Sequence, residues 1–97
     1  MRSVPEDLPG HELVSTGLAD LADGRDSEEA LLVAMAAPRL RALGLEVPEW
    51  GGERPSHRLW EKLSDTDVDA HSRYNALVRR MVSFARAAEH AVSATGG

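Results

Sequence analysis

The chain has 97 residues, of which 42% are hydrophobic and 4% aromatic; it has no cysteine and a formal net charge of −5. This length makes one domain, and the lack of cysteine excludes disulfides and cysteine-ligated metal sites. No segment approaches the roughly 20 apolar residues of a membrane-spanning helix, and residues 1–10 lack the apolar stretch of a secretion signal, so we expect a cytoplasmic protein without membrane contact.

The composition favours helices. Alanine, the residue with the highest helix propensity, is abundant, and no run of β-branched residues reads as a strand. We therefore predict an all-α fold for residues 1–97, a small bundle of four main helices with a long C-terminal helix at about 69–92. Segment 1–9 carries two prolines and segment 93–97 ends in two glycines, so both are expected to be loosely ordered.

The first predicted helix covers about residues 10–23. Apolar residues recur along it at three- to four-residue spacing, which gives it one apolar face. Gly17 interrupts this face and costs roughly 1 kcal/mol relative to alanine in a helix interior. The sequence therefore predicts that another backbone passes close to Gly17. Gly24 ends the helix.

The second predicted helix begins at Asp26. This residue can cap the helix, and Glu29 follows three residues later, as in a capping box. Residues 30–37 are apolar on almost every side, which predicts a helix buried between partners. The residue before a proline is pushed away from helical angles, so Ala37 should mark a break, followed by a short helix over 39–43.

Residues 45–55 contain two prolines and a Gly-Gly pair, which predict an irregular segment. Trp50 within it is expected to cover the edge of the core. A further helix is predicted over about 56–64, with Ser56 as its cap. Its inner face is expected to consist of Leu59, Trp60 and Leu63.

The long C-terminal helix contains neither proline nor glycine over 69–92. Thr66, with Asp69 three residues later, resembles a capping box at its start. Apolar residues at three- to four-residue spacing form one continuous seam along it. The seam can cover this protein's own core or meet a second copy, and it consists of Tyr74, Leu77, Met81, Phe84, Ala88 and Ala91.

Arginines accompany this seam. Arg73 and Arg80 are seven residues apart and directly flank it, where ion pairs form between paired helices. Arg79 and Arg86 lie further out, toward solvent. Within the helix, Glu89 offers the one local ion pair, three residues after Arg86. The row of arginines is therefore either a solvated face or a contact surface for acidic groups or RNA phosphates.

The charges are unevenly distributed along the chain. The first fifty residues hold four arginines against ten acids, and the remainder holds seven basic residues against six acids, so the two parts carry −6 and +1. The acidic part can pair with the arginines within one molecule or between two. The overall acidity argues against a dedicated nucleic-acid binder. Ten arginines against one lysine in an alanine-rich chain are typical of a GC-rich bacterial genome.

Metal sites are not predicted. A calcium loop starting at Asp65 would need glycine at its sixth position and glutamate at its twelfth, where the chain has Ala70 and Ala76. The acids around this point, Asp67 included, are explained by helix capping. Asp67 and His71 are four residues apart and could share a metal ion with His57. The chain has no HExxH motif and no pair of histidines at metal spacing, so we expect no metal and no cofactor.

Catalytic motifs are also absent from the sequence. A nucleophilic serine would need a neighbouring base and a third orienting group, and the chain has no GxSxG motif. The Arg86-x-x-x-His90 spacing resembles the Arg and His pair of HEPN-type ribonucleases, which are helical and carry the pair on a C-terminal helix. That family places four to six residues between the two and a polar residue after the arginine, where this chain has three and Ala87. The resemblance implies a small helical ribonuclease as one alternative.

The expected function is that of a non-enzymatic protein-interaction or self-association module, with no catalytic residue. A homodimer through the long helix is favoured, because this helix and the apolar second helix together exceed what one small core can cover. A regulatory or antitoxin-like protein that contacts another protein or RNA through the arginines is a further alternative. The expected interface consists of Tyr74, Leu77, Met81 and Phe84, flanked by Arg73 and Arg80.

Overall fold

The computed structural model describes residues 3–66 and 68–96, with side chains as far as residue 93. This part of the chain forms helices and no strands, which confirms the all-α prediction. The helices are α1 (His11–Ala22), α2 (Glu28–Met35), α3 (Ala37–Ala42), α4 (Pro55–Thr66) and α5 (Ala70–Gly96). None of the described helices is long and apolar enough to cross a membrane.

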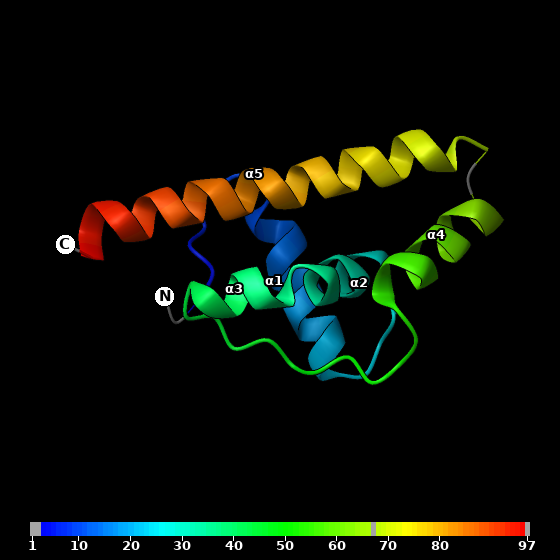
Figure 1. The fold of residues 1–97 in the computed structure, drawn as a ribbon, viewed down its shortest axis with the longest axis horizontal. Helices are drawn as coiled ribbons and strands as arrows, with labels where there is room; N and C mark the ends of the chain where they lie inside the picture. Colours follow the sequence, from blue (N-terminus) through cyan, green and yellow to red (C-terminus); the bar gives the residue numbers. More distant parts are fainter. Residues whose placement is uncertain (1–2, 67, 97) are drawn as a thin grey trace.

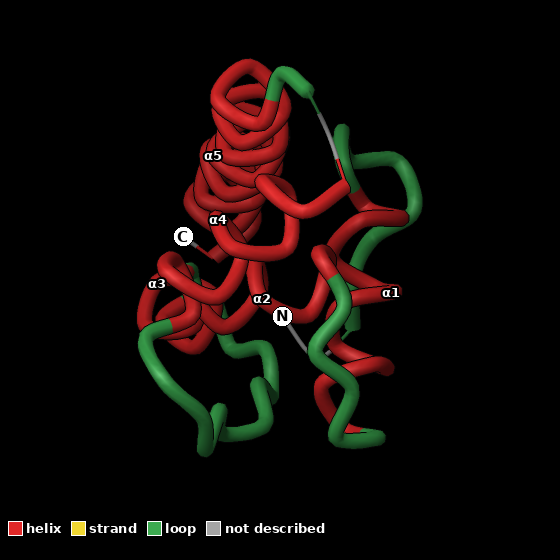
Figure 2. Tube along the Cα trace, turned by 90° about the vertical axis from the view of Figure 1, so that its right-hand side faces the viewer, coloured by secondary structure: helices red, strands yellow, loops and turns green. Residues whose placement is uncertain are grey.

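The long helix α5 runs along one side of the molecule and covers the other helices (Figure 1). Its 27 residues span about 40 Å at 1.5 Å per residue, close to the longest dimension of the molecule, 45 Å. Helix α4 lies beneath the N-terminal end of α5, while α1, α2 and α3 lie beneath its middle. The view along α5 shows α2 inside, between α1, α4 and α5 (Figure 2).

The core surrounds α2. Four successive residues of this helix are buried, Ala30 to Val33, so the prediction of an inner helix that is apolar on all sides is confirmed. Because a helix buried on every side meets apolar partners in several directions, α2 contacts α1, α3, α4 and α5. Helix α5 adds Leu77, Met81, Phe84 and Ala88 to the same core.

Close contact between α1 and α2 explains Gly17. A Cβ atom at this position would lie 2.5 Å from the carbonyl oxygen of Glu29 and would also overlap the side chain of Val33. Real Cβ atoms do not approach backbone so closely. The predicted close approach of another backbone at Gly17 is therefore confirmed.

The cap of α2 differs from the prediction. Ser27, not Asp26, occupies the N-cap position, and its Oγ accepts a hydrogen bond of 3.1 Å from the backbone N–H of Ala30. The Ser27 hydroxyl also donates to Oδ2 of Asp20 at 2.7 Å. The capping-box pairing of Asp26 with Glu29 is thus wrong by one residue, because the serine takes the cap and leaves Asp26 free to reach α4.

Other helix boundaries also shift. The break before Pro38 falls at Ala36, and Ala37 is already the first residue of α3. Helix α4 begins at Pro55, so Ser56 lies inside its first turn and is not the cap. Proline suits the first helical position because the amide hydrogen that it lacks would have no partner there.

The start of α5 has a different cap from the predicted one. Thr66 is the last residue of α4, and its hydroxyl donates to the carbonyl oxygen of Lys62 at 3.0 Å. Asp69 caps α5 instead, since its Oδ1 accepts from the backbone N–H of Ser72 at 3.4 Å. The predicted helix of 69–92 extends to Gly96.

The two tryptophans occupy different environments. Trp50 is partly buried against the core, as predicted, and its Nε1 donates to the backbone carbonyl of Glu53. Trp60 is 40% exposed and was wrongly placed on the inner face of its helix, where Leu59 and Leu63 are buried. Its ring lies edge-on to Tyr74, with centroids 6.0 Å apart.

The segment before α1 contains turns and packed residues. The backbone N–H of Leu8 donates to the carbonyl of Pro5, and that of His11 to the carbonyl of Leu8. Val4 and Leu8 pack against the core. This part of the N-terminal segment therefore contributes apolar contacts that its proline-rich sequence does not indicate.

Candidate interaction groove

The apolar seam of α5 is used by the protein's own core. Leu77 is 3% exposed, Met81 5% and Phe84 0%. Tyr74 is half-buried and contacts the ring of Trp60. Three of the four apolar residues expected at an interface therefore already have partners inside the molecule, and a contact surface must use neighbouring residues.

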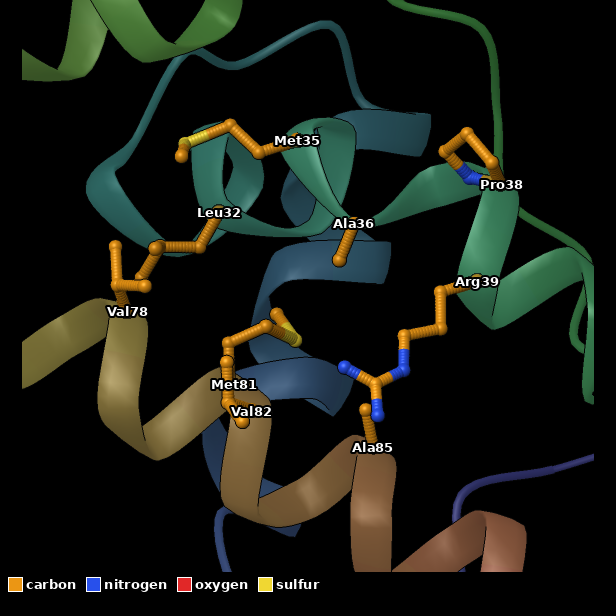
Figure 3. Close-up of a pocket in the computed structure, with 9 residues that line it drawn as sticks. All are labelled: Leu32, Met35, Ala36, Pro38, Arg39, Val78, Met81, Val82 and Ala85. Carbon is orange, nitrogen blue, oxygen red and sulfur yellow. The ribbon is translucent and has the colours of Figure 1, made fainter.

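An apolar groove opens beside this seam, between α5 and the corner where α2 meets α3 (Figure 3). Its volume is about 300 Å³. Eight of its nine lining residues are apolar, and the exception is an arginine. The lining residues are Leu32, Met35, Ala36, Pro38, Arg39, Val78, Met81, Val82 and Ala85.

Local sequence produces this groove. The chain turns at Ala36 because proline at the second position of α3 cannot continue the hydrogen bonding of α2. Helix α5 passes this corner and presents Val78 and Val82, which are four residues apart and hence on one side of the helix. Both valines are half-buried, so their remaining surface faces the groove. This second apolar row was missed in the sequence, although its four-residue spacing beside the seam is a signal for it.

A double hydrogen bond between α3 and α5 lies beside the groove. The Nε and Nη2 atoms of Arg39 donate to the two carboxylate oxygens of Glu89 at 2.6 and 2.7 Å. These hydrogen bonds lower the pKa of Glu89 and raise that of Arg39. The expected pairing of Glu89 with Arg86 is thus replaced by one with another helix, and Arg86 acts on Glu89 only as a nearby charge.

Two arginines follow the outer edge of the groove on α5. At 100° per residue, Arg79 and Arg86 both lie within about 60° of Val82 around the helix axis. Both are exposed, and neither forms an ion pair or hydrogen bond with any residue that the structure describes. This edge therefore carries two positive charges that no part of the described chain neutralises by direct contact.

The predicted flanking pair, Arg73 and Arg80, lies on the opposite side of the seam. Arg73 reaches Oε1 of Glu28 at 3.4 Å. Arg80 is exposed and lines a shallow hollow with Glu12 and Glu29. These two arginines face α1 and α2 and do not border the groove.

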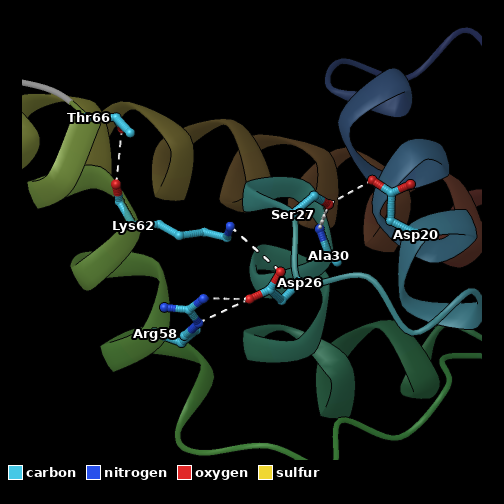
Figure 4. Close-up of polar contacts among 7 residues, drawn as sticks. All are labelled: Asp20, Asp26, Ser27, Ala30, Arg58, Lys62 and Thr66. Atoms are coloured by element: carbon cyan, nitrogen blue, oxygen red, sulfur yellow. Dashed lines mark hydrogen bonds and ion pairs between the residues drawn. The ribbon is translucent and has the colours of Figure 1, made fainter.

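Acidic residues of the first half form ion pairs with basic residues of the second half inside one molecule. This was one of the two possibilities that the charge distribution left open. The Nε and Nη2 atoms of Arg58 donate to Oδ2 of Asp26 at 3.0 and 2.8 Å, and Lys62 lies 3.6 Å from Oδ1 (Figure 4). The hydrogen bonds from Arg58 lower the pKa of Asp26. Asp26 thus joins the start of α2 to α4.

The ribonuclease alternative gains no support from the geometry. Arg86 and His90 are both exposed. No hydrogen bond joins either side chain to another described residue. The Asp67 and His71 pair cannot be placed, because Asp67 lies outside the described residues, while His71 contacts Asn75 and the edge of Trp60.

No family model matches the chain, and no curated protein or solved structure is significantly similar to it.

Proposed function

We propose that the protein is a non-enzymatic interaction module that binds an amphipathic helix of another protein in the groove between α5 and the α2–α3 corner. The observation that carries this proposal is the groove itself, with eight apolar lining residues in nine and two unpaired arginines at its edge. Helices bind such grooves through apolar residues spaced along one face, while their polar face stays in water.

The size of the groove fits side chains better than a whole small molecule. A volume of about 300 Å³ is at the lower end of the range for small-molecule sites. Met35 forms one wall and is half-buried, and methionine adapts its shape to different apolar partners. A few apolar side chains from one face of a helix would fill this space.

The edge of the groove favours an acidic partner. The molecule carries −5 overall, so its net charge repels an acidic partner, while Arg79 and Arg86 attract one locally. Local complementarity of this kind orients a partner and raises its association rate more than its final affinity. The partner helix is therefore expected to carry acidic residues beside its apolar face.

Self-association is the second candidate occupant. Two α5 helices could pair antiparallel around Val82, but Arg79 of one helix would then lie opposite Arg86 of the other. Like charges that face each other across an interface cost several kcal/mol. Phe84 is also fully buried. The homodimer expected from the sequence, which has Phe84 in its interface, would therefore have to open the core. These two observations favour a different protein over a second copy.

The test uses a photoreactive amino acid placed at Val82 in the native host, with the same amino acid at the exposed Ala19 of α1 as the matched control. We expect position 82, and not position 19, to crosslink to an acidic helical segment of another protein. Met35→Glu should abolish the crosslink because a charge then enters the apolar groove. Crosslinks only to a second copy would replace the proposal by self-association, and equal crosslinking from both positions would overturn it.

A further inference from the structure

A second cluster of polar residues lies at the start of α4, away from the groove. It contains two glutamates and a histidine, each four residues from the next: Glu53, His57 and Glu61. One ligand atom from each lies within 4.8 Å of the other two, and this is the one such group among the described residues. The sequence signal for this group is the four-residue spacing of two carboxylates around His57, which was considered above only as an addition to Asp67 and His71.

The distance between two of these groups fits a shared metal ion. His57 Nε2 and Glu61 Oε1 are 3.5 Å apart. Two ligand atoms bound tetrahedrally to zinc at 2.0–2.1 Å are separated by about 3.3 Å. A metal ion between them therefore needs almost no rearrangement of α4, since the two residues already lie one helical turn apart on the same side.

One oxygen of Glu61 has an unusual environment, although the side chain as a whole is 44% exposed. Its Oε1 atom is shielded from solvent, yet it has no hydrogen-bond partner among the described residues. An oxygen shielded in this way normally accepts a hydrogen bond or binds a cation. The nearby imidazole of His57, at 3.5 Å, is at the outer limit of such contacts.

The loop before α4 holds the third residue in place. Trp50 donates its Nε1 hydrogen to the backbone carbonyl of Glu53. A Cβ atom at Gly52 would lie 2.8 Å from the indole ring, so the loop folds closely against Trp50. The Glu53 side chain is exposed and needs to move only slightly to complete a set of three ligands.

Arg58 is the competing cation. Glu53 and Glu61 lie near enough to contribute to the raised pKa of its guanidinium. Its Nε and Nη2 hydrogens, however, are donated to Asp26. Arg58 therefore leaves the ligand atoms of the glutamates open to a second cation.

We propose that Glu53, His57 and Glu61 form a site for a divalent transition-metal ion, with Zn²⁺ as the best match. Imidazole nitrogen with carboxylate oxygen is a donor set that zinc accepts, whereas Mg²⁺ and Ca²⁺ prefer oxygen alone. Three protein ligands leave the fourth position to water. The site is separate from the groove and does not depend on the proposed function.

The test is calorimetric titration of the untagged, chelator-treated protein with ZnCl₂. We expect one saturable site that His57→Ala removes. Glu53→Gln and Glu61→Gln should each weaken binding by about tenfold or more, because loss of an outer hydrogen-bond partner alone already costs 10–100-fold. The His57 side chain is 62% exposed, so its removal leaves the core intact, and circular dichroism checks the helix content of each variant.

His90→Ala is the matched control, since it removes an exposed histidine of α5 and should leave Zn²⁺ binding unchanged. Equal binding of Mg²⁺ would identify a general attraction of cations to acidic side chains and would overturn the proposal. Absence of Zn²⁺ binding, or binding that survives His57→Ala, would overturn it as well.

Discussion

Gly17 allows α1 and α2 to approach each other more closely than any side chain would permit. The atoms that a Cβ would meet include backbone, the carbonyl of Glu29, which cannot rotate away as the end of a side chain can. The cost of a glycine in a helix interior, roughly 1 kcal/mol relative to alanine, is thus offset by contact between two helices that both contribute to the core.

Gly17→Ala should therefore destabilise the protein even though alanine is the better helix former. Overpacking costs about 1–3 kcal/mol, and in a domain of this size each kcal/mol lowers the midpoint of thermal unfolding by about 4–8 °C. The matched control is Ser15→Ala, an exposed position in the same helix, which should change the midpoint little or raise it. A Gly17→Ala variant as stable as the unchanged protein in a thermal scan would show that the helices are not in close contact.

At the scale of elements, the break between α2 and α3 has two consequences. It ends the innermost helix before a third turn is complete, and it places α3 where Arg39 can reach α5. The double hydrogen bond from Arg39 to Glu89 then ties the corner to the long helix. The groove lies between this pair of hydrogen bonds and the core, so its shape depends on α3 and α5 keeping their relative positions.

The ion pair between Arg39 and Glu89 predicts that the stability of the protein depends on pH. The pKa of Glu89 is lowered in the folded protein by hydrogen bonds from Arg39, so the folded state favours the ionised carboxylate. Its contribution to stability is present above the ordinary pKa of 4.5 and is lost as the pH falls through the lowered value. Asp26 acts in the same direction through Arg58.

Glu89→Gln should remove part of the loss of stability at acid pH, because the neutral amide cannot be protonated there. Urea unfolding at neutral pH and below the ordinary carboxyl pKa measures this difference. Glu46→Gln changes an exposed acid that has no ion pair among the described residues, so it serves as the control. If both variants lose as much stability at acid pH as the unchanged protein does, the ion pair between α3 and α5 does not contribute to the pH dependence.

Sequence patterns predicted the elements better than their ends. Three features could be predicted because they depend on residues that are neighbours in the sequence. These are the all-round apolar character of α2, the break before Pro38 and the close contact at Gly17. The caps were misplaced because Ser27, Asp26 and Thr66 all have side chains that can cap. Which of them caps depends on partners in other helices, such as Arg58 for Asp26, and these are not visible in local sequence.

At the scale of the whole molecule, the seam of α5 could not be assigned from sequence alone. Its apolar residues suit a core and an interface equally well, and the difference lies in whether α1 and α2 fit beneath them. The structure shows that they do, since Phe84 is fully buried. The candidate groove depends on the corner between α2 and α3 meeting Val78 and Val82, residues that are more than forty positions apart from it in the chain.

The charge distribution of the molecule gives the last prediction. Two synthetic amphipathic peptides with the same apolar residues, one with glutamate and one with lysine on the polar face, should bind differently. The acidic peptide should bind more tightly, because Arg79 and Arg86 attract it. Its affinity should fall as salt is raised, since charges separated by more than about 10 Å are screened at 0.1 M salt.

Arg79→Gln combined with Arg86→Gln should remove most of the salt dependence and lower the association rate, while Val82→Glu should abolish binding through the groove. Arg73→Gln combined with Arg80→Gln is the matched control, because it removes the same number of charges from the opposite side of α5, and neither residue borders the groove. Fluorescence anisotropy of the labelled peptides measures each affinity. If the Arg73 and Arg80 variant weakens acidic-peptide binding as strongly as the Arg79 and Arg86 variant, the attraction comes from the total charge of the helix, and the arginines beside the groove have no special part in recognition.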